Sequence, residues 1–153
     1  MKIGILSDTH GFLDPRIHGL FAGVGHILHA GDIGLDTIIA ELETIAPATA
    51  VLGNTDSSST FKPTESVAVD GRKFLVHHIV DPHALKEELR LRLARERPDV
   101  VVFGHTHKAF CQRINGTLFF NPGYAGKPKS GVERSVAILH TDGKEITHEF
   151  LPL

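Results

Sequence analysis

The chain has 153 residues, of which 41% are hydrophobic and 22% charged, and its formal net charge is −2. This balance excludes a strongly basic nucleic-acid-binding surface, and no apolar run approaches the roughly 18 residues of a membrane span. Cys111 is the only cysteine, so an intramolecular disulfide is excluded and a reducing compartment is the simpler reading. We expect one cytoplasmic domain over residues 1–153, with no membrane partner and no strong nucleic-acid footprint.

The first two thirds of the chain alternate short apolar runs with segments of helical periodicity. In chain order these segments predict a strand at 2–6, a helix at 15–21, a strand at 26–29, a helix at 36–44, strands at 49–52 and 73–76, a helix at 82–97 and a strand at 100–103. Because the strands are apolar throughout, we expect both of their faces to be covered.

The last third of the chain changes character. Residues 110–114 and 117–120 flank Asn115-Gly116, which predicts a hairpin with a two-residue turn. Residues 135–140 and 145–151 flank a second turn at 141–144 and predict another hairpin. We therefore expect mainly antiparallel strands in this part of the chain.

Polar residues of metal-binding type follow each of the five predicted strands of the alternating part. In chain order they are Asp8 and His10, then Asp32, then Asn54 and Asp56, then His77 and His78, and finally His105 and His107. Ligands bind in parallel α/β sheets outside the carboxyl ends of the strands, and aspartate oxygens and imidazole nitrogens are ligands for divalent metals. Each motif alone is an ordinary turn sequence. Their repetition after successive strands is what predicts a metal site.

In this order, the motifs resemble those of the calcineurin-like metallophosphoesterases: Asp8-Thr9-His10, Gly31-Asp32, Gly53-Asn54, His77 and Gly104-His105-Thr106-His107. The short length, the sequence Gly53-Asn54-Thr55-Asp56 and the later Asn121-Pro122-Gly123 are similar to the compact phosphodiesterase branch from bacteria and archaea. The resemblance implies an α/β fold, namely a four-layer α/β/β/α sandwich of two mixed β-sheets flanked by helices.

The resemblance also implies two divalent metal ions per chain, with manganese preferred and nickel, zinc or iron as alternatives. Asp8, His10 and His107 would hold the first ion. Asn54, His77 and His105 would hold the second, and Asp32 would bridge both. A hydroxide shared by the metals would attack phosphorus in line, so that the protein would hydrolyse a small phosphodiester.

Two positions depart from the family pattern. Many larger relatives carry a histidine after Gly-Asn that helps the leaving group, whereas Thr55 and Asp56 stand here. The family usually reads His-Gly where this chain reads His77-His78. We prefer His77 as the ligand because it directly ends an apolar run, and a one-residue shift that makes His78 the ligand remains the alternative. The residues expected to take part in catalysis are Asp32, Asn54, Asp56 and His78.

Two further side chains are weighed near these motifs. His29 is either a residue that supports the ligands or a plain strand residue, and Asn121 is expected to brace the metal ligands. Two other functions stay open, a protein-binding scaffold on the same fold with little or no catalysis and a phosphomonoesterase. A homodimer is also left open.

Overall fold

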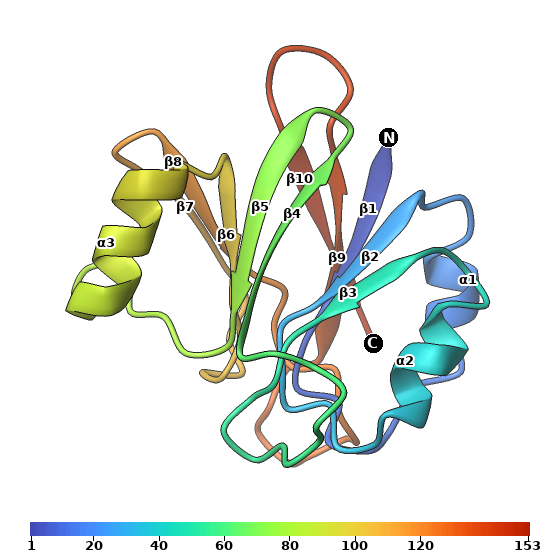
Figure 1. Ribbon diagram of the computed structural model, residues 1–153. Coiled ribbons are helices and arrows are strands. Elements are labelled where there is room, and N and C mark those ends of the chain that lie inside the picture. The colour runs from blue at the N-terminus through green and yellow to red at the C-terminus, as the bar shows by residue number, and fades with distance from the viewer.

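The computed structural model describes residues 1–153 as four layers (Figure 1). Two five-stranded sheets pack face to face in the middle of the molecule. Helices α1 (Ile17–Leu20) and α2 (Thr37–Leu42) cover the outer face of one sheet, and α3 (Glu87–Glu96) covers the outer face of the other. This arrangement confirms the predicted sandwich of two mixed sheets flanked by helices.

The first sheet has the strand order β10-β9-β1-β2-β3. Its members are β1 (Lys2–Leu6), β2 (His26–His29), β3 (Ala48–Ala50), β9 (Ser135–His140) and β10 (Thr147–Pro152). Strands β1, β2 and β3 run parallel, and β9 and β10 form the predicted antiparallel hairpin beside β1.

The second sheet has the strand order β4-β5-β6-β8-β7. Its members are β4 (Thr64–Val69), β5 (Arg72–His77), β6 (Val100–Val102), β7 (Phe110–Ile114) and β8 (Thr117–Asn121). Strands β5, β6 and β8 are parallel, with β4 and β7 antiparallel at the edges. Strand β4 was not predicted, and α3 begins at Glu87 rather than at residue 82. None of the three helices has the length and hydrophobicity needed to span a bilayer.

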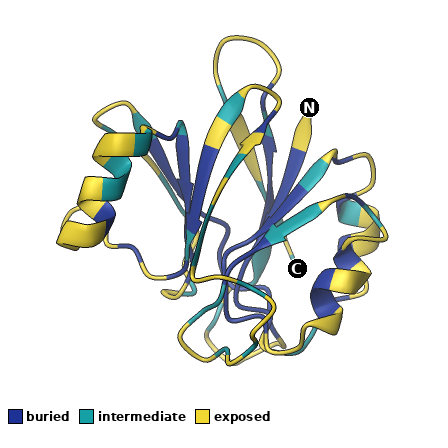
Figure 2. Ribbon diagram, in the orientation of Figure 1, coloured by how far each residue is buried: buried dark blue, intermediate teal, exposed yellow.

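The central strands are mostly buried (Figure 2), and their side chains alternate between two buried environments. Ile3 and Ile5 of β1 and Phe74 and Val76 of β5 lie in the core between the two sheets. The intervening Leu75 of β5 packs instead in the core beneath α3. Both faces of each central strand are therefore buried, as expected from the apolar runs.

The parallel strands of both sheets end at one edge of the sandwich. The connections that leave β1, β2, β3, β5 and β6 gather at the lower edge of the view in Figure 1. Residues distant in sequence meet there, as the backbone hydrogen bonds from Asp8 to Gly31 and from Gly104 to His78 show. This edge carries the candidate site.

Candidate metal centre

The buried carboxylates of Asp8 and Asp32 form the centre of the site. Asp8 follows β1 and is fully buried, and its Oδ2 accepts hydrogen bonds from the Ser7 hydroxyl at 2.8 Å and from the His105 backbone amide at 3.2 Å. Oδ1 of Asp8 is buried with no hydrogen-bond partner. Asp32 follows β2, and its Oδ1 accepts the backbone amide of Thr55 at 3.0 Å. Each carboxylate is thus held through one oxygen, while the other oxygen faces the histidines.

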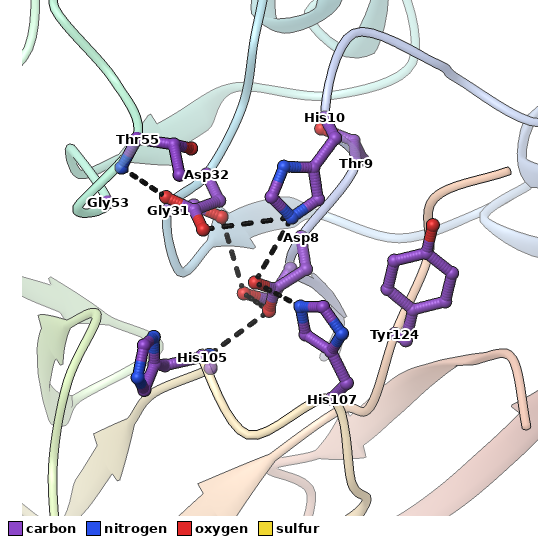
Figure 3. Close-up of polar contacts among 12 residues, drawn as sticks. Asp8, Thr9, His10, Gly31, Asp32, Gly53, Thr55, His105, His107 and Tyr124 are labelled. Atoms are coloured by element: carbon purple, nitrogen blue, oxygen red, sulfur yellow. Dashed lines mark hydrogen bonds and ion pairs between the residues drawn. The ribbon is translucent and has the colours of Figure 1, made fainter. Parts of the chain in front are cut away.

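Two histidines approach Asp8 from the loops after β1 and β6 (Figure 3). His107 Nε2 lies 3.3 Å from Asp8 Oδ1, and His10 Nε2 lies 3.7 Å from the same oxygen. His10 Nε2 is also 3.6 Å from Asp32 Oδ2, so this ring faces both carboxylates. Asp8, His10 and His107 converge closely enough to hold one metal ion.

His78 supplies the buried imidazole on the other side of the carboxylates. Its Nδ1 lies 2.7 Å from the carbonyl oxygen of Ala30, and because a carbonyl only accepts, Nδ1 carries the proton. Its Nε2 lies 3.3 Å from Asp32 Oδ2 and 3.8 Å from Asp8 Oδ1, without a hydrogen bond. Asp8, Asp32 and His78 form a second group of suitable size for a metal ion.

His77, the preferred ligand, does not join this cluster. Its Nδ1 lies 2.8 Å from the hydroxyl of Thr64 on the neighbouring strand β4, and its ring lines a groove beside α3. His77 continues the face of β5 that carries Leu75, whereas His78 follows the face of Phe74 and Val76. His78, which a shift of one residue would make the ligand, is the histidine that lies beside the carboxylates.

His105 and Asn54 lie beside the second group. The Nδ1 atom of His105 is 3.1 Å from Oδ1 of Asn54, and the ring centroids of His105 and His78 are 5.4 Å apart. His105 and Asn54 are exposed, whereas Asp8 and His78 are buried. Of the seven predicted ligands, the structure brings six to one edge and places His78 where His77 was expected.

Backbone conformation distinguishes the candidate ligands from ordinary loop residues. Asp8, His10, Asp32, His105 and His107 all have φ between 47° and 71°, a left-handed region that non-glycine residues seldom adopt. Such conformations cost on the order of 1–3 kcal/mol each and concentrate at functional sites.

Two glycines allow the loops to approach the carboxylates. A Cβ on Gly53 would lie 2.0 Å from Asp32 Oδ1, and one on Gly104 would lie 2.1 Å from Ser7 Oγ. Both loops can lie this close because neither position has a side chain.

Asp56 holds the loops of the site rather than facing its centre. Its Oδ2 accepts the backbone amides of Ile33 and Gly53 at 3.0 and 2.8 Å, and its Oδ1 accepts that of Gly34 at 3.0 Å. The carboxylate therefore ties the loop after β2 to the loop after β3. Asp56, one of the residues expected to take part in catalysis, therefore makes a positioning contact in this geometry.

Asn121 and His29 also support the loops. Asn121 Nδ2 donates to the Gly104 carbonyl at 3.0 Å and to the Thr106 hydroxyl at 3.1 Å, which fixes the turn that carries His105. His29 accepts the Gly31 amide on Nδ1, so its Nε2 donates to the Thr9 hydroxyl at 3.0 Å. Complete burial lowers the pKa of His29 to about 3 and keeps it neutral.

Tyr124 and Lys129 are neighbours of the site that the sequence did not single out. The buried ring of Tyr124 lies 4.7 Å from that of His107, and Lys129 Nζ is 5.0 Å from the centre of the Tyr124 ring. The only sequence signal was the position of Tyr124 directly after the turn at Gly123.

The electrostatics of the cluster favour a bound cation. Burial alone would raise the pKa of Asp32, but the Thr55 amide and the neighbouring histidines outweigh burial and lower it, so the carboxylate stays ionised. Burial lowers the pKa of His107 and so favours its neutral, metal-binding form. Neutral imidazoles and ionised carboxylates are a donor set that suits divalent transition metals.

Comparisons with known proteins place the sequence in a family. A sequence model of the calcineurin-like phosphoesterase superfamily domain matches residues 1–144. A probable metallophosphoesterase from Methanothermobacter thermautotrophicus is 32% identical over 159 residues, covering 99% of this chain and 92% of the relative. A phosphodiesterase from Methanocaldococcus jannaschii is 30% identical over 165 residues, covering 95% of this chain and 96% of the relative.

A solved structure shows a similar fold at lower identity. Vps29 from Entamoeba histolytica, crystallised in complex with zinc, matches 99% of this chain and 99% of its own with a TM-score of 0.74 and 22% identity. This likeness concerns the fold alone.

Proposed function

The chain belongs to the calcineurin-like phosphoesterase superfamily, and we propose that it is a two-metal phosphodiesterase that hydrolyses a small phosphodiester. The observation that carries the proposal is the pair of buried atoms without partners, Asp8 Oδ1 and His78 Nε2. These atoms face each other at 3.8 Å, and both present lone pairs because the proton of His78 is on Nδ1. Two buried acceptors without a partner are unfavourable, and a cation bound between them would satisfy both.

The proposed ligands divide into two groups around the carboxylates. Asp8, His10 and His107 would hold one ion. His78, His105 and Asn54 would hold the other, and Asp32, whose Oδ2 faces both His10 and His78, would bridge the two. Manganese is our first choice of metal, with nickel, zinc and iron as alternatives, because the donors are imidazoles and hard oxygens. Bound divalent ions supply Lewis-acid polarisation of the phosphoryl oxygens and lower the pKa of a water molecule.

The residues of the chain perform the remaining tasks. Ser7 and the His105 amide hold Asp8 Oδ2, and the Thr55 amide holds Asp32 Oδ1, so both carboxylates keep their orientation during the reaction. In-line attack of water on phosphorus breaks the bond to the leaving oxygen, which then takes up a proton. Asp56 is occupied by three backbone amides, so we assign that proton to solvent.

A diester is favoured over a monoester by the charge around the cluster. Histidines are the only side chains that form ion pairs with Asp8 and Asp32, and no lysine or arginine does so. A monoanionic diester needs less positive charge than a dianionic terminal phosphate. The relative from M. jannaschii is itself a phosphodiesterase.

The test compares esters on the protein loaded with manganese. We expect release of nitrophenol from bis(p-nitrophenyl) phosphate at a higher kcat/KM than from p-nitrophenyl phosphate, with about two metal ions bound per chain. The variant Asp32→Asn should lose this activity by about 100-fold or more. Asp36→Asn is the matched control, since Asp36 lies four residues on and its carboxylate accepts hydrogen bonds only from the hydroxyls of Ser58 and Thr60. Metal binding without hydrolysis of any ester would instead support the protein-binding scaffold.

A further inference from the structure

A cavity of about 530 Å³ lies directly beside His105. One wall comes from the segment after β5, with Ile79 and Val80. The other comes from Phe103 and Ala109 in the segment between β6 and β7 and from Phe110 at the start of β7. Gly104, His105 and Thr106 also line it, so the cavity and the metal centre share the same turn, and Asp81, Pro82, His83 and Lys108 complete the lining. Its size falls within the range of small-molecule sites.

Most of the accessible surface of this cavity is apolar, although charged and polar residues lie among those that line it. Ile79 is 42% exposed and is one of four large hydrophobic residues that are exposed on the molecule. Phe103 and Phe110 present their rings to each other at 5.8 Å and an interplanar angle of 61°, which makes one wall aromatic. An exposed apolar surface next to a polar centre indicates a binding function.

A second cavity on the other side of the same turn has a different character. It has a volume of about 580 Å³ and is lined by His107, Lys108, Glu133 and other mostly polar residues. In Figure 3, His105, which lines the first cavity, and His107, which lines the second, lie on opposite sides of the Asp8 carboxylate. A phosphodiester has two organic substituents, and a phosphoryl group at the centre would direct them toward unlike surroundings.

We propose that the apolar cavity beside His105, lined by Ile79, Phe103 and Phe110, binds a flat apolar substituent of the phosphodiester substrate. The proposal rests on the proposed function for the position of the phosphoryl group. It names the substrate class as a diester with one aromatic or similarly flat arm. Burial of such an arm against Ile79 and the phenylalanine rings removes apolar surface from water.

The test measures binding of two inert mimics of a diester to the manganese-loaded protein by calorimetry. Dimethylphosphinate and methyl(phenyl)phosphinate both carry one negative charge and contain no ester bond, so hydrolysis does not affect the result. We expect the phenyl compound to bind roughly tenfold more tightly. In Ile79→Ser the ratio of the two Kd values, dimethylphosphinate over methyl(phenyl)phosphinate, should fall below about threefold, while the Kd of dimethylphosphinate stays the same.

Two further variants define the place of binding. Leu91→Ser removes another exposed apolar side chain, 52% exposed on α3 and outside the cavity, and should retain the full ratio. Ala109→Trp fills the cavity from the opposite wall and should abolish the preference for the phenyl compound. Because Ala109 does not line the neighbouring groove that Ile79 also lines, this result would place the phenyl group in the cavity and not in the groove.

Equal affinities for the two phosphinates, or no binding of either, would overturn the proposal. If the loaded protein then still hydrolyses diesters, the proposed function stands and only the apolar subsite is lost. If the phenyl preference is present but no ester is hydrolysed, the subsite stands and the proposed function fails.

Discussion

At the scale of single residues, the adjacent pair His77 and His78 shows what alternation along a strand does to a site. Phe74 and Val76 face the core between the sheets, so His78 continues toward the metal centre while His77 turns toward Thr64. The sequence could not decide between them, because Leu75 on the opposite face is as apolar and as buried as its neighbours.

This pair allows a test with an internal control. We expect His78→Ala to lower kcat/KM for a chromogenic diester by about 100-fold or more and to lose bound manganese, because the buried imidazole faces both carboxylates. His77→Ala should stay within about threefold of the parent protein. Activity assays with metal analysis measure both effects. A larger loss in the His77 variant would mean that β5 ends in the other register.

Other residues of the site were predictable to different degrees. Asp8, His10, Asp32 and His107 could be identified because each follows a strand that ends at the same edge. The contact of Asp56 with three amides depends on how two loops meet, which no local pattern encodes.

At the scale of elements, local turn chemistry was the most reliable guide. Asn115 and Gly116 have φ values of 49° and 83°, as a two-residue hairpin turn requires, and the predicted hairpin is present. The start of α3 was predicted five residues early because Asp81 accepts the amide of His83 and forms a separate turn before the helix.

Strand β4 (Thr64–Val69) was missed for a different reason. It is an edge strand whose residues are mostly half-buried or exposed, so its sequence lacks the apolar run that marked the central strands. The antiparallel pairing with β5 stabilises this segment as a strand, and such pairing is not visible in the sequence pattern.

The turn after β6 depends on the absence of a side chain at Gly104. A Cβ there would meet Ser7 Oγ at 2.1 Å and Asp8 Oδ2 at 2.7 Å, both buried and hydrogen-bonded to each other. We expect Gly104→Ala to lower the free energy of unfolding by about 1–3 kcal/mol and to reduce metal affinity, because overpacking displaces Asp8.

The control for this substitution is Gly19→Ala in α1. Gly19 has open space around its Cα and lies in a helix, so alanine should stabilise the protein by about 0.5–1 kcal/mol. Denaturant unfolding measures both variants. An equal response at the two positions would contradict the close approach at Gly104.

At the scale of the whole molecule, the site exists because two sheets place their parallel strands at one edge. The order of motifs predicted that edge, but not that Asp8 and Asp32 come from one sheet while His78 and His107 come from the other. The stability of the metal-free protein should therefore depend on buried polar side chains that connect the loops at this edge. His29, the last residue of β2, is the clearest of these.

The fully buried His29 predicts acid sensitivity of the fold. The unfolded chain binds a proton at this residue near pH 6.5, whereas burial lowers the pKa in the folded protein to about 3. Between these values the unfolded state holds more protons, so the free energy of unfolding falls as the pH drops, by about 1.4 kcal/mol per pH unit for one proton. Urea unfolding of the metal-free protein between pH 7 and 4 measures how steeply the free energy of unfolding changes with pH.

The variant His29→Gln retains hydrogen-bonding groups but cannot take up the proton. The slope of its free energy of unfolding against pH should therefore be shallower by the contribution of about one proton. An unchanged slope would show that the folded protein admits a charged His29 beside Thr9.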